Sequence, residues 1–140
     1  MKQKEPKVAV AIIVEKENKI LLGLLSKKWS INGEQVYGIL GRDIKFGEKI
    51  GDTAKRVILE ELGCNTTSCK IFSVNANYLF ENHYIEIGVI ATISGELKNL
   101  SPEDWERWEW FDSANIPVSI FPSATNVIES YNQKAVCISE

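Results

Sequence analysis

The segment from Gly41 to Cys64, GRDIKFGEKIGDTAKRVILEELGC, constrains the fold of this chain more than any other stretch. Glycines punctuate its first half, which predicts an irregular loop, and the apolar periodicity of its second half predicts a helix from about Asp52 to Leu62. Asp52 or Thr53 is a candidate N-cap, and Gly63 can adopt the left-handed conformation that ends a helix. The segment therefore predicts a loop that leads directly into a helix.

Two adjacent carboxylates, Glu60 and Glu61, fall in the last turn of this predicted helix. A helix C-terminus favours cations, so two acids there need an explanation. A divalent cation such as magnesium or manganese provides one because these ions prefer oxygen ligands. A solvated acidic surface explains the same residues without any ligand. Arg56 lies one turn before Glu60 and has a second candidate partner in Glu48, so we expect it to tie the loop to the helix rather than to catalyse.

The rest of the chain predicts strands arranged mainly in hairpins. One hairpin is predicted at residues 8–14 and 19–25, and another at residues 71–80 and 84–93. Single strands are expected at 36–40 and 106–111, and a closing helix is expected at 122–131. Residues 26–35 are polar and predict a loop. Strands in hairpins that are interrupted by two helices indicate an α/β sandwich with a mixed sheet, not a doubly wound one. The length of 140 residues fits a single domain, 1–140.

Composition excludes several classes of protein. A net charge of -3 and a pI of about 5.3 argue against a nucleic-acid or membrane-surface partner. The three cysteines, Cys64, Cys69 and Cys137, are odd in number and widely spaced, which favours reduced, buried thiols over disulfides or a zinc site. The first apolar run is too short for a membrane span, so we expect a cytoplasmic protein.

The spacing of the glycine, acidic and basic residues between Gly41 and Cys64 resembles the Nudix box, a pattern of glycine, glutamate, arginine and paired glutamates at fixed spacings. The residues in register with it are Glu48, Arg56, Ile58, Glu60, Glu61, Gly63 and Cys64. The hairpin before the box and residues 102–111 are also similar to this family, so the resemblance covers nearly the whole chain. The loop 41–48, the Asn82-His83-Tyr84 triplet and the Trp108-Glu109-Trp110 strand look like its small nucleotide triphosphate diphosphatases.

The resemblance implies a Nudix-type α/β/α sandwich and metal-dependent hydrolysis of a pyrophosphate bond in a nucleoside triphosphate or other nucleoside diphosphate derivative. It implies Mg²⁺ or Mn²⁺ held by Glu60 and Glu61, with the Gly41 backbone carbonyl as a further candidate ligand. Asp43, which has no counterpart in the family loop, is another candidate ligand. Glu61 and Glu60 are the expected catalytic residues, supported by Arg56 and Glu48. The implied partner is a nucleotide or a nucleoside diphosphate derivative, and a homodimer is one expected assembly.

This sequence departs from the box at two positions. Arg42 stands in place of the first glycine, and Val57 stands in place of the glutamate that follows the box arginine. A carboxylate at position 57 would lie one turn from Glu61 and face the same ion, whereas valine cannot bind a hard cation. Loss of a general base slows a reaction by roughly 10²- to 10⁴-fold. Three functions remain open: a hydrolase, slow because of Val57; a nucleotide-binding module with impaired chemistry; and an interaction protein without a nucleotide.

Four residues outside the matched offsets have two interpretations each. Arg42 is a candidate phosphate contact or a surface arginine, and Asp43 is a substitute carboxylate or a solvated loop acid. Trp29 precedes the box and is predicted either to contact substrate or to pack. His83, the only histidine, is a candidate substrate-binding residue or a bystander at a hairpin tip. Arg42, Trp29 and His83 are thus the predicted substrate contacts.

Overall fold

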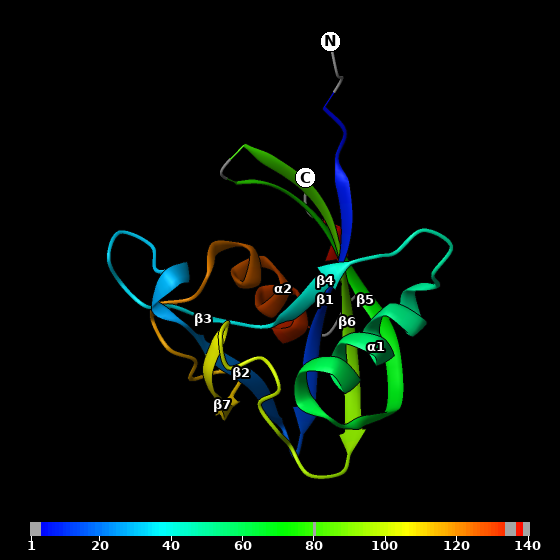
Figure 1. Cartoon of the computed structure of the whole chain (residues 1–140), viewed down its shortest axis with the longest axis vertical. Helices are drawn as coiled ribbons and strands as arrows, with labels where there is room; N and C mark the ends of the chain where they lie inside the picture. Colours follow the sequence, from blue (N-terminus) through cyan, green and yellow to red (C-terminus); the bar gives the residue numbers. More distant parts are fainter. Residues whose placement is uncertain (1–3, 80, 134–136, 139–140) are drawn as a thin grey trace.

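The protein is described by a computed structural model that covers residues 4–79, 81–133 and 137–138. Its elements follow the chain as a hairpin, two short strands, a helix, a long hairpin, a further strand and a second helix (Figure 1). Their bounds are β1 (Lys7–Lys16), β2 (Lys19–Leu25), the 3₁₀ turn η1 (Lys27–Trp29), β3 (Tyr37–Gly38), β4 (Leu40–Asp43), α1 (Ile50–Leu62), β5 (Asn65–Leu79), β6 (Asn82–Ser94), β7 (Trp105–Asp112), α2 (Pro122–Gln133) and β8 (Cys137–Ile138).

The strands form a mixed sheet, as the sequence predicted, and β1 lies in the middle of it. β4 pairs with β1 in antiparallel orientation, and β6 lies parallel to it on the other side, with Ile12 opposite Val89. β5 continues this sheet beyond β6, and β8 runs parallel to β5. β2 leaves the end of β1 as a hairpin and pairs with both β3 and β7. The box loop and helix are therefore attached to the central strand through β4.

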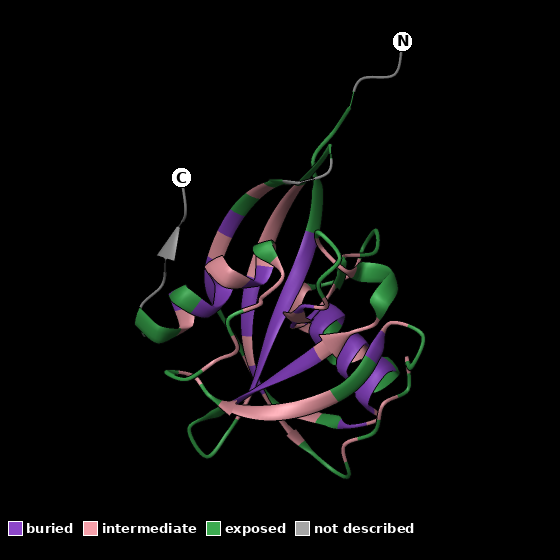
Figure 2. Ribbon diagram, turned by 90° about the vertical axis from the view of Figure 1, so that its left-hand side faces the viewer, coloured by how far each residue is buried: buried purple, intermediate pink, exposed green. Residues whose placement is uncertain are grey.

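The two helices cover opposite sides of β1, which gives the predicted α/β/α sandwich (Figure 1). Val10, Ile12 and Val14 of β1 belong to a core cluster with the buried face of α1, whereas Ala11 and Ile13 belong to a second cluster with α2. Buried residues run through β1 and along the inner side of α1 (Figure 2). A strand covered on both faces reads as a continuous apolar run, which explains the sequence of β1.

The start of α1 differs from the sequence prediction. The helix begins at Ile50, and its N-cap is Lys49, whose side chain makes no capping hydrogen bond. The prediction that Asp52 or Thr53 caps the helix was wrong, because both residues lie inside its first turn; Thr53 Oγ1 donates instead to Glu48 Oε1 at 2.7 Å. The predicted end is confirmed: Gly63 has φ 67° and its N–H donates to the Leu59 carbonyl at 3.1 Å.

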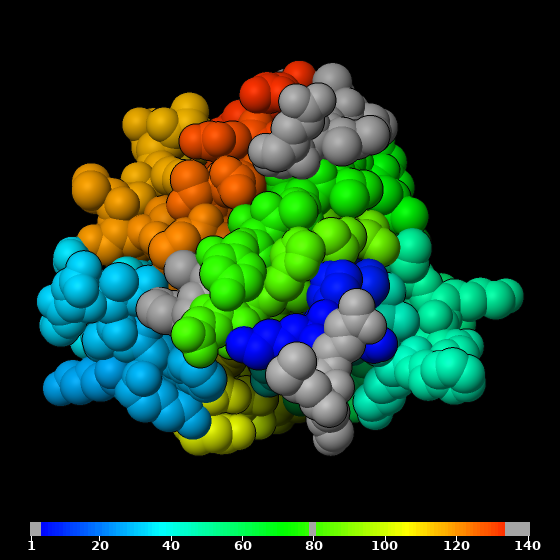
Figure 3. Space-filling view, turned by 90° about the horizontal axis from the view of Figure 1, so that it is seen from above, coloured from blue at the N-terminus to red at the C-terminus, as the bar shows by residue number. Residues whose placement is uncertain are grey.

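Strand lengths also differ from the prediction. The single strand expected at 36–40 is divided into β3 and β4, and the second hairpin is longer than expected because β5 begins at Asn65. Polar residues at 65–70 obscured this extension. Phe80, the end of the predicted strand 71–80, lies outside the described residues. Figure 3 shows the green hairpin of β5 and β6 lying between the orange residues of α2 and the dark-blue start of β1.

Two smaller expectations concern the cysteines and the membrane. Cys64 is buried and Cys69 is partly exposed, and neither forms a disulfide. The side chain of Cys137 lies outside the described part of the structure. Among the described residues, no helix is both long enough and apolar enough to cross a membrane.

Candidate functional site

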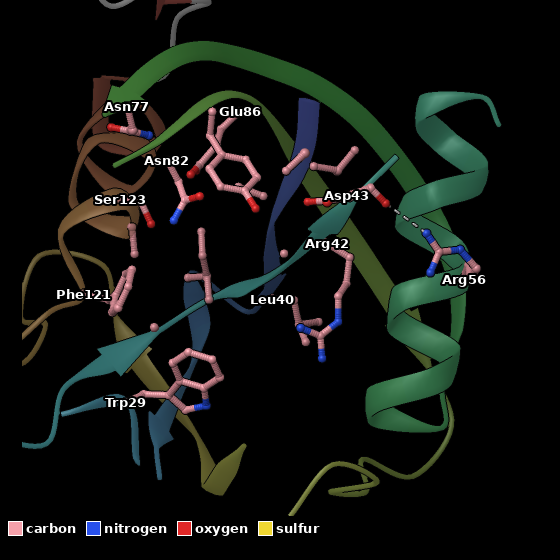
Figure 4. A pocket seen from close by; sticks show the side chains of 18 of the residues that line it. Trp29, Leu40, Arg42, Asp43, Arg56, Asn77, Asn82, Glu86, Phe121 and Ser123 are labelled. Carbon is pink, nitrogen blue, oxygen red and sulfur yellow. Dashed lines mark hydrogen bonds between the residues drawn. The ribbon is translucent and has the colours of Figure 1, made fainter. Parts of the chain in front are cut away.

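A cavity of about 700 Å³ opens between β1 and β4, the hairpin of β5 and β6, and the start of α2. Figure 4 shows side chains from all of these elements directed toward it. The residues labelled there are Trp29, Leu40, Arg42, Asp43, Arg56, Asn77, Asn82, Glu86, Phe121 and Ser123. Of the predicted site residues, Arg42, Asp43, Arg56, Trp29 and Gly41 line this cavity, whereas Glu48, Glu60, Glu61 and His83 do not.

The cavity is lined by chemically distinct groups. In Figure 4, Trp29 and Phe121 lie on one side of the view and Arg56 on the other, with Arg42 between them. Amide and carboxyl groups of β5 and β6 form the polar wall opposite β4. The site therefore combines aromatic surface, cationic groups and hydrogen-bonding groups around one open cavity.

Glu48 and Arg56 connect the box loop to α1. Arg56 Nε donates to Glu48 Oε2 at 2.8 Å and Arg56 Nη2 donates to Glu48 Oε1 at 3.1 Å, so Glu48, a candidate partner of Arg56 in the sequence, forms a bidentate pair with it. Arg56 Nη2 also donates to the carbonyl of Asp43 at 3.2 Å (Figure 4). The hydrogen bond from Arg56, followed by those from Thr53 and the Lys45 amide, lowers the pKa of Glu48 to about 2. Arg56 is thus held in a fixed orientation.

Glu61 lies on the sheet-facing side of α1 and is only 3% exposed. Its Oε1 accepts hydrogen bonds from Trp105 Nε1 at 3.0 Å and from Arg42 Nη2 at 3.1 Å. Its Oε2 is buried and has no hydrogen-bond partner among the described residues. Burial raises the pKa of Glu61, while Trp105 and Arg42 oppose that rise. Glu61 is therefore a buried carboxylate whose nearest cation is an arginine.

Asp104, which precedes β7, is a site residue that sequence reasoning missed. Its Oδ2 lies 3.6 Å from Arg42 Nη2, and its Oδ1 accepts from Lys28 Nζ at 3.0 Å and from Trp29 Nε1 at 3.1 Å. The bond from Lys28 is the main reason why the pKa of Asp104 is lowered. An acid next to a tryptophan was the only local signal, and its partners are more than 60 residues away in the chain.

The side chains that the resemblance implies as metal ligands do not gather. The Glu60 side chain is 56% exposed and lies 3.5 Å from Arg56 Nη1, whereas that of Glu61 is 4% exposed and faces Arg42. Val57 shares the buried face of α1 with Glu61 and packs in the core. The described residues contain no group of three or more His, Cys, Asp or Glu able to hold a metal ion. In this arrangement the residues do not fit a divalent cation, and the metal assignment stays a prediction.

Two further residues of the polar wall, Glu86 and Asn77, carried no sequence signal because each is one polar position in a strand. Burial raises the pKa of Glu86, and the polar side chain of Asn77 opposes that rise. His83 is placed elsewhere, with its ring packed edge-on against Tyr78 at a centroid distance of 6.4 Å. It borders a separate depression beside residues 4–7. The structure therefore does not bring His83 to the cavity.

No family model matches this chain. Its fold is similar to that of a MutT NUDIX hydrolase from Burkholderia pseudomallei, with a TM-score of 0.79 and 20% identity over 91% of this chain and 98% of that one. A MutT protein from Methanosarcina mazei Go1 gives a TM-score of 0.77 at 16% identity, covering 95% and 98% of the two chains. The NUDIX domain of Shewanella oneidensis NrtR, solved with ADP ribose, gives 0.71 at 14% identity, covering 94% and 90%. The chain has the Nudix fold.

Proposed function

From this Nudix fold and its cavity, we propose that the protein binds a nucleotide or another nucleoside diphosphate derivative. The observation that carries the proposal is that the guanidinium groups of Arg42 and Arg56 and the aromatic rings of Trp29 and Phe121 line the same cavity. Planar guanidinium groups match phosphate oxygens, and aromatic rings stack on nucleobases. A volume of about 700 Å³ lies within the range of small-molecule sites.

The lining residues suggest separate roles in binding. Arg56 is already oriented by Glu48, which also balances its charge, so its guanidinium is a preorganised polar surface of the cavity rather than a free cation. Arg42 is 47% exposed and can turn remaining donors toward a phosphate. Glu86 and Asn77 supply hydrogen-bonding groups for the ribose or the base. The NrtR domain with bound ADP ribose supports a ligand of this chemical class.

Isothermal titration calorimetry with ADP-ribose, UDP-glucose and dGTP tests this proposal. We expect at least one probe to bind, and we expect Trp29→Leu and Arg42→Gln each to weaken it by about tenfold, the effect of losing one stacking or charged contact. His83→Gln is the matched control because His83 lies outside the cavity. A panel without binding, or equal losses in the control, would reject the site.

The second candidate function is hydrolysis of a pyrophosphate bond with Mg²⁺ or Mn²⁺. The unpartnered Oε2 of Glu61 favours it, as do the solved structures described as NUDIX hydrolases. It ranks second because Arg42 already forms a hydrogen bond with the Glu61 carboxylate and because position 57 carries no carboxylate. The test is phosphate release across nucleoside triphosphates and diphosphate sugars with each metal. We expect a slow rate that Glu61→Gln abolishes; a rate that survives this substitution would come from elsewhere.

A further inference from the structure

We propose that Arg42 is the built-in cation of this site and takes the place of the divalent cation that the box resemblance implies. The proposal concerns the ion balance around Glu61 and holds whether or not a nucleotide is the ligand. Two features support it: the guanidinium lies between two carboxylates, and the buried carboxylate has one oxygen without a hydrogen-bond partner in the described part of the chain.

The position of Arg42 is set by the central sheet. Its backbone pairs with Val10 of β1, and from there its Nη2 reaches Glu61 Oε1 at 3.1 Å and Asp104 Oδ2 at 3.6 Å. One arginine thus joins β4, the end of α1 and the segment before β7. Lys28 provides the second positive charge at Asp104. Glu61 and Asp104 are therefore balanced by Arg42 and Lys28, and the four groups carry no net charge.

A divalent cation at Glu61 would have to displace this arrangement. The guanidinium remains charged at every accessible pH, so it cannot give up its charge and can only move away. A metal ion that bound Glu61 while Arg42 stayed in place would lie a few ångströms from another positive group, and the two would repel. Trp105, which is 6% exposed, fills the remaining position on Oε1. Arg42 is thus expected to exclude the ion.

Removal of Arg42 should uncover a cation site. Glu61 Oε2 is a buried acceptor that no described residue contacts with a hydrogen bond, so it is available to a cation. Among the described residues, Arg42 is the only positively charged side chain that forms an ion pair with Glu61. Glycine at position 42, the residue of the box pattern, would leave Glu61 and Asp104 with an uncompensated negative charge. This charge should attract a divalent ion.

Manganese titration followed by water-proton relaxation tests the proposal on the full chain. We expect weak binding by the natural protein and binding by Arg42→Gly that is tighter by about tenfold or more, since one opposing charge is lost at a half-exposed site. Arg42→Lys keeps the charge and should remain weak. Arg42→Gly combined with Glu61→Gln should lose the gain, which assigns the new site to Glu61.

Either of two results would overturn the proposal: manganese binding by the natural protein as tight as in Arg42→Gly, or a gain that survives Glu61→Gln. Circular dichroism checks that each variant is folded. If Arg42→Gly does not fold, Arg42→Gln provides the same test with a side chain better suited to a strand, and its failure to bind manganese more tightly would also overturn the proposal. Nucleotides are absent from these titrations, so failure of the nucleotide proposal leaves the result unaffected.

Discussion

Trp105→Phe should destabilise the protein largely through a single hydrogen bond, from Trp105 Nε1 to Glu61 Oε1 at 3.0 Å. Both residues are buried, with exposures of 6% and 3%. Phenylalanine keeps an aromatic ring beside Trp108, whose ring centroid is 4.3 Å away, but it has no donor. The buried carboxylate would then keep Arg42 as its one remaining hydrogen-bond donor among the described residues.

The magnitude follows from the charge on the acceptor. A hydrogen bond to a charged group contributes about 1.5–3 kcal/mol, and the smaller ring adds a packing loss that does not depend on pH. Burial already raises the folded-state pKa of Glu61 above 4.5, and losing the indole raises it further. The contribution of Glu61 to stability therefore falls as pH rises from 4.5 through this raised pKa, and it should fall more in the variant. The variant's extra loss is present at neutral pH and disappears in acid.

Urea unfolding followed by circular dichroism measures the loss at neutral pH and near pH 4.5, the ordinary value for a glutamate. A double-mutant cycle with Glu61→Leu separates the hydrogen bond from the packing term. We expect a coupling free energy of about 1.5–3 kcal/mol at neutral pH and a smaller one in acid. Equal losses at both pH values, or a coupling below about 0.5 kcal/mol, would refute this reasoning.

Three further predictions concern α1 and its loop. Because the pKa of Glu48 is lowered to about 2, its pairing with Arg56 should stabilise the protein above pH 4.5 and lose this effect as pH falls toward 2. Thermal melts across this pH range should show that the melting temperature of the natural protein exceeds that of Arg56→Ala by less in acid. A difference that stays constant with pH would contradict this prediction. Val57→Glu should lower the free energy of unfolding by several kcal/mol because the side chain is fully buried, whereas Val57→Ile should cost much less; urea unfolding compares them, and equal losses would disagree. Gly63→Ala should cost about 1 kcal/mol because φ is 67°, and an unchanged melting temperature would count against this.

Local chemistry made much of the fold predictable. The apolar run of β1 and the left-handed glycine after α1 each follow from short stretches of sequence, and both are present in the structure. The pair of Glu48 and Arg56 was also predictable, because a loop followed directly by a helix limits how far apart the two residues can lie. Predictions of this kind depend on neighbours within about two turns.

Contacts between distant segments were not predictable in the same way. Asp104 joins the site through Arg42, Lys28 and Trp29, and no local pattern separates it from a solvated turn acid. Glu61 was recognised as an important acid, but its burial against Trp105 depends on how β7 packs near α1. The helix-cap prediction was wrong for a related reason. The Thr53 hydroxyl donates a hydrogen bond to Glu48 in the loop and does not cap the helix.

The two departures from the box, Arg42 and Val57, together change the balance of charge around Glu61. Position 57 lies on the same buried face of α1 as Glu61, so a glutamate there would place two carboxylates against the sheet, and a divalent ion would balance them. With Val57, one buried carboxylate remains, and the single charge of Arg42 balances it. Val57→Glu alone should therefore be poorly tolerated, because Arg42 cannot neutralise both acids. Combining it with Arg42→Gly should give a protein whose melting temperature rises with manganese, by linkage, more than that of either single variant. If the double variant gained no more than Arg42→Gly alone, the two positions would act independently.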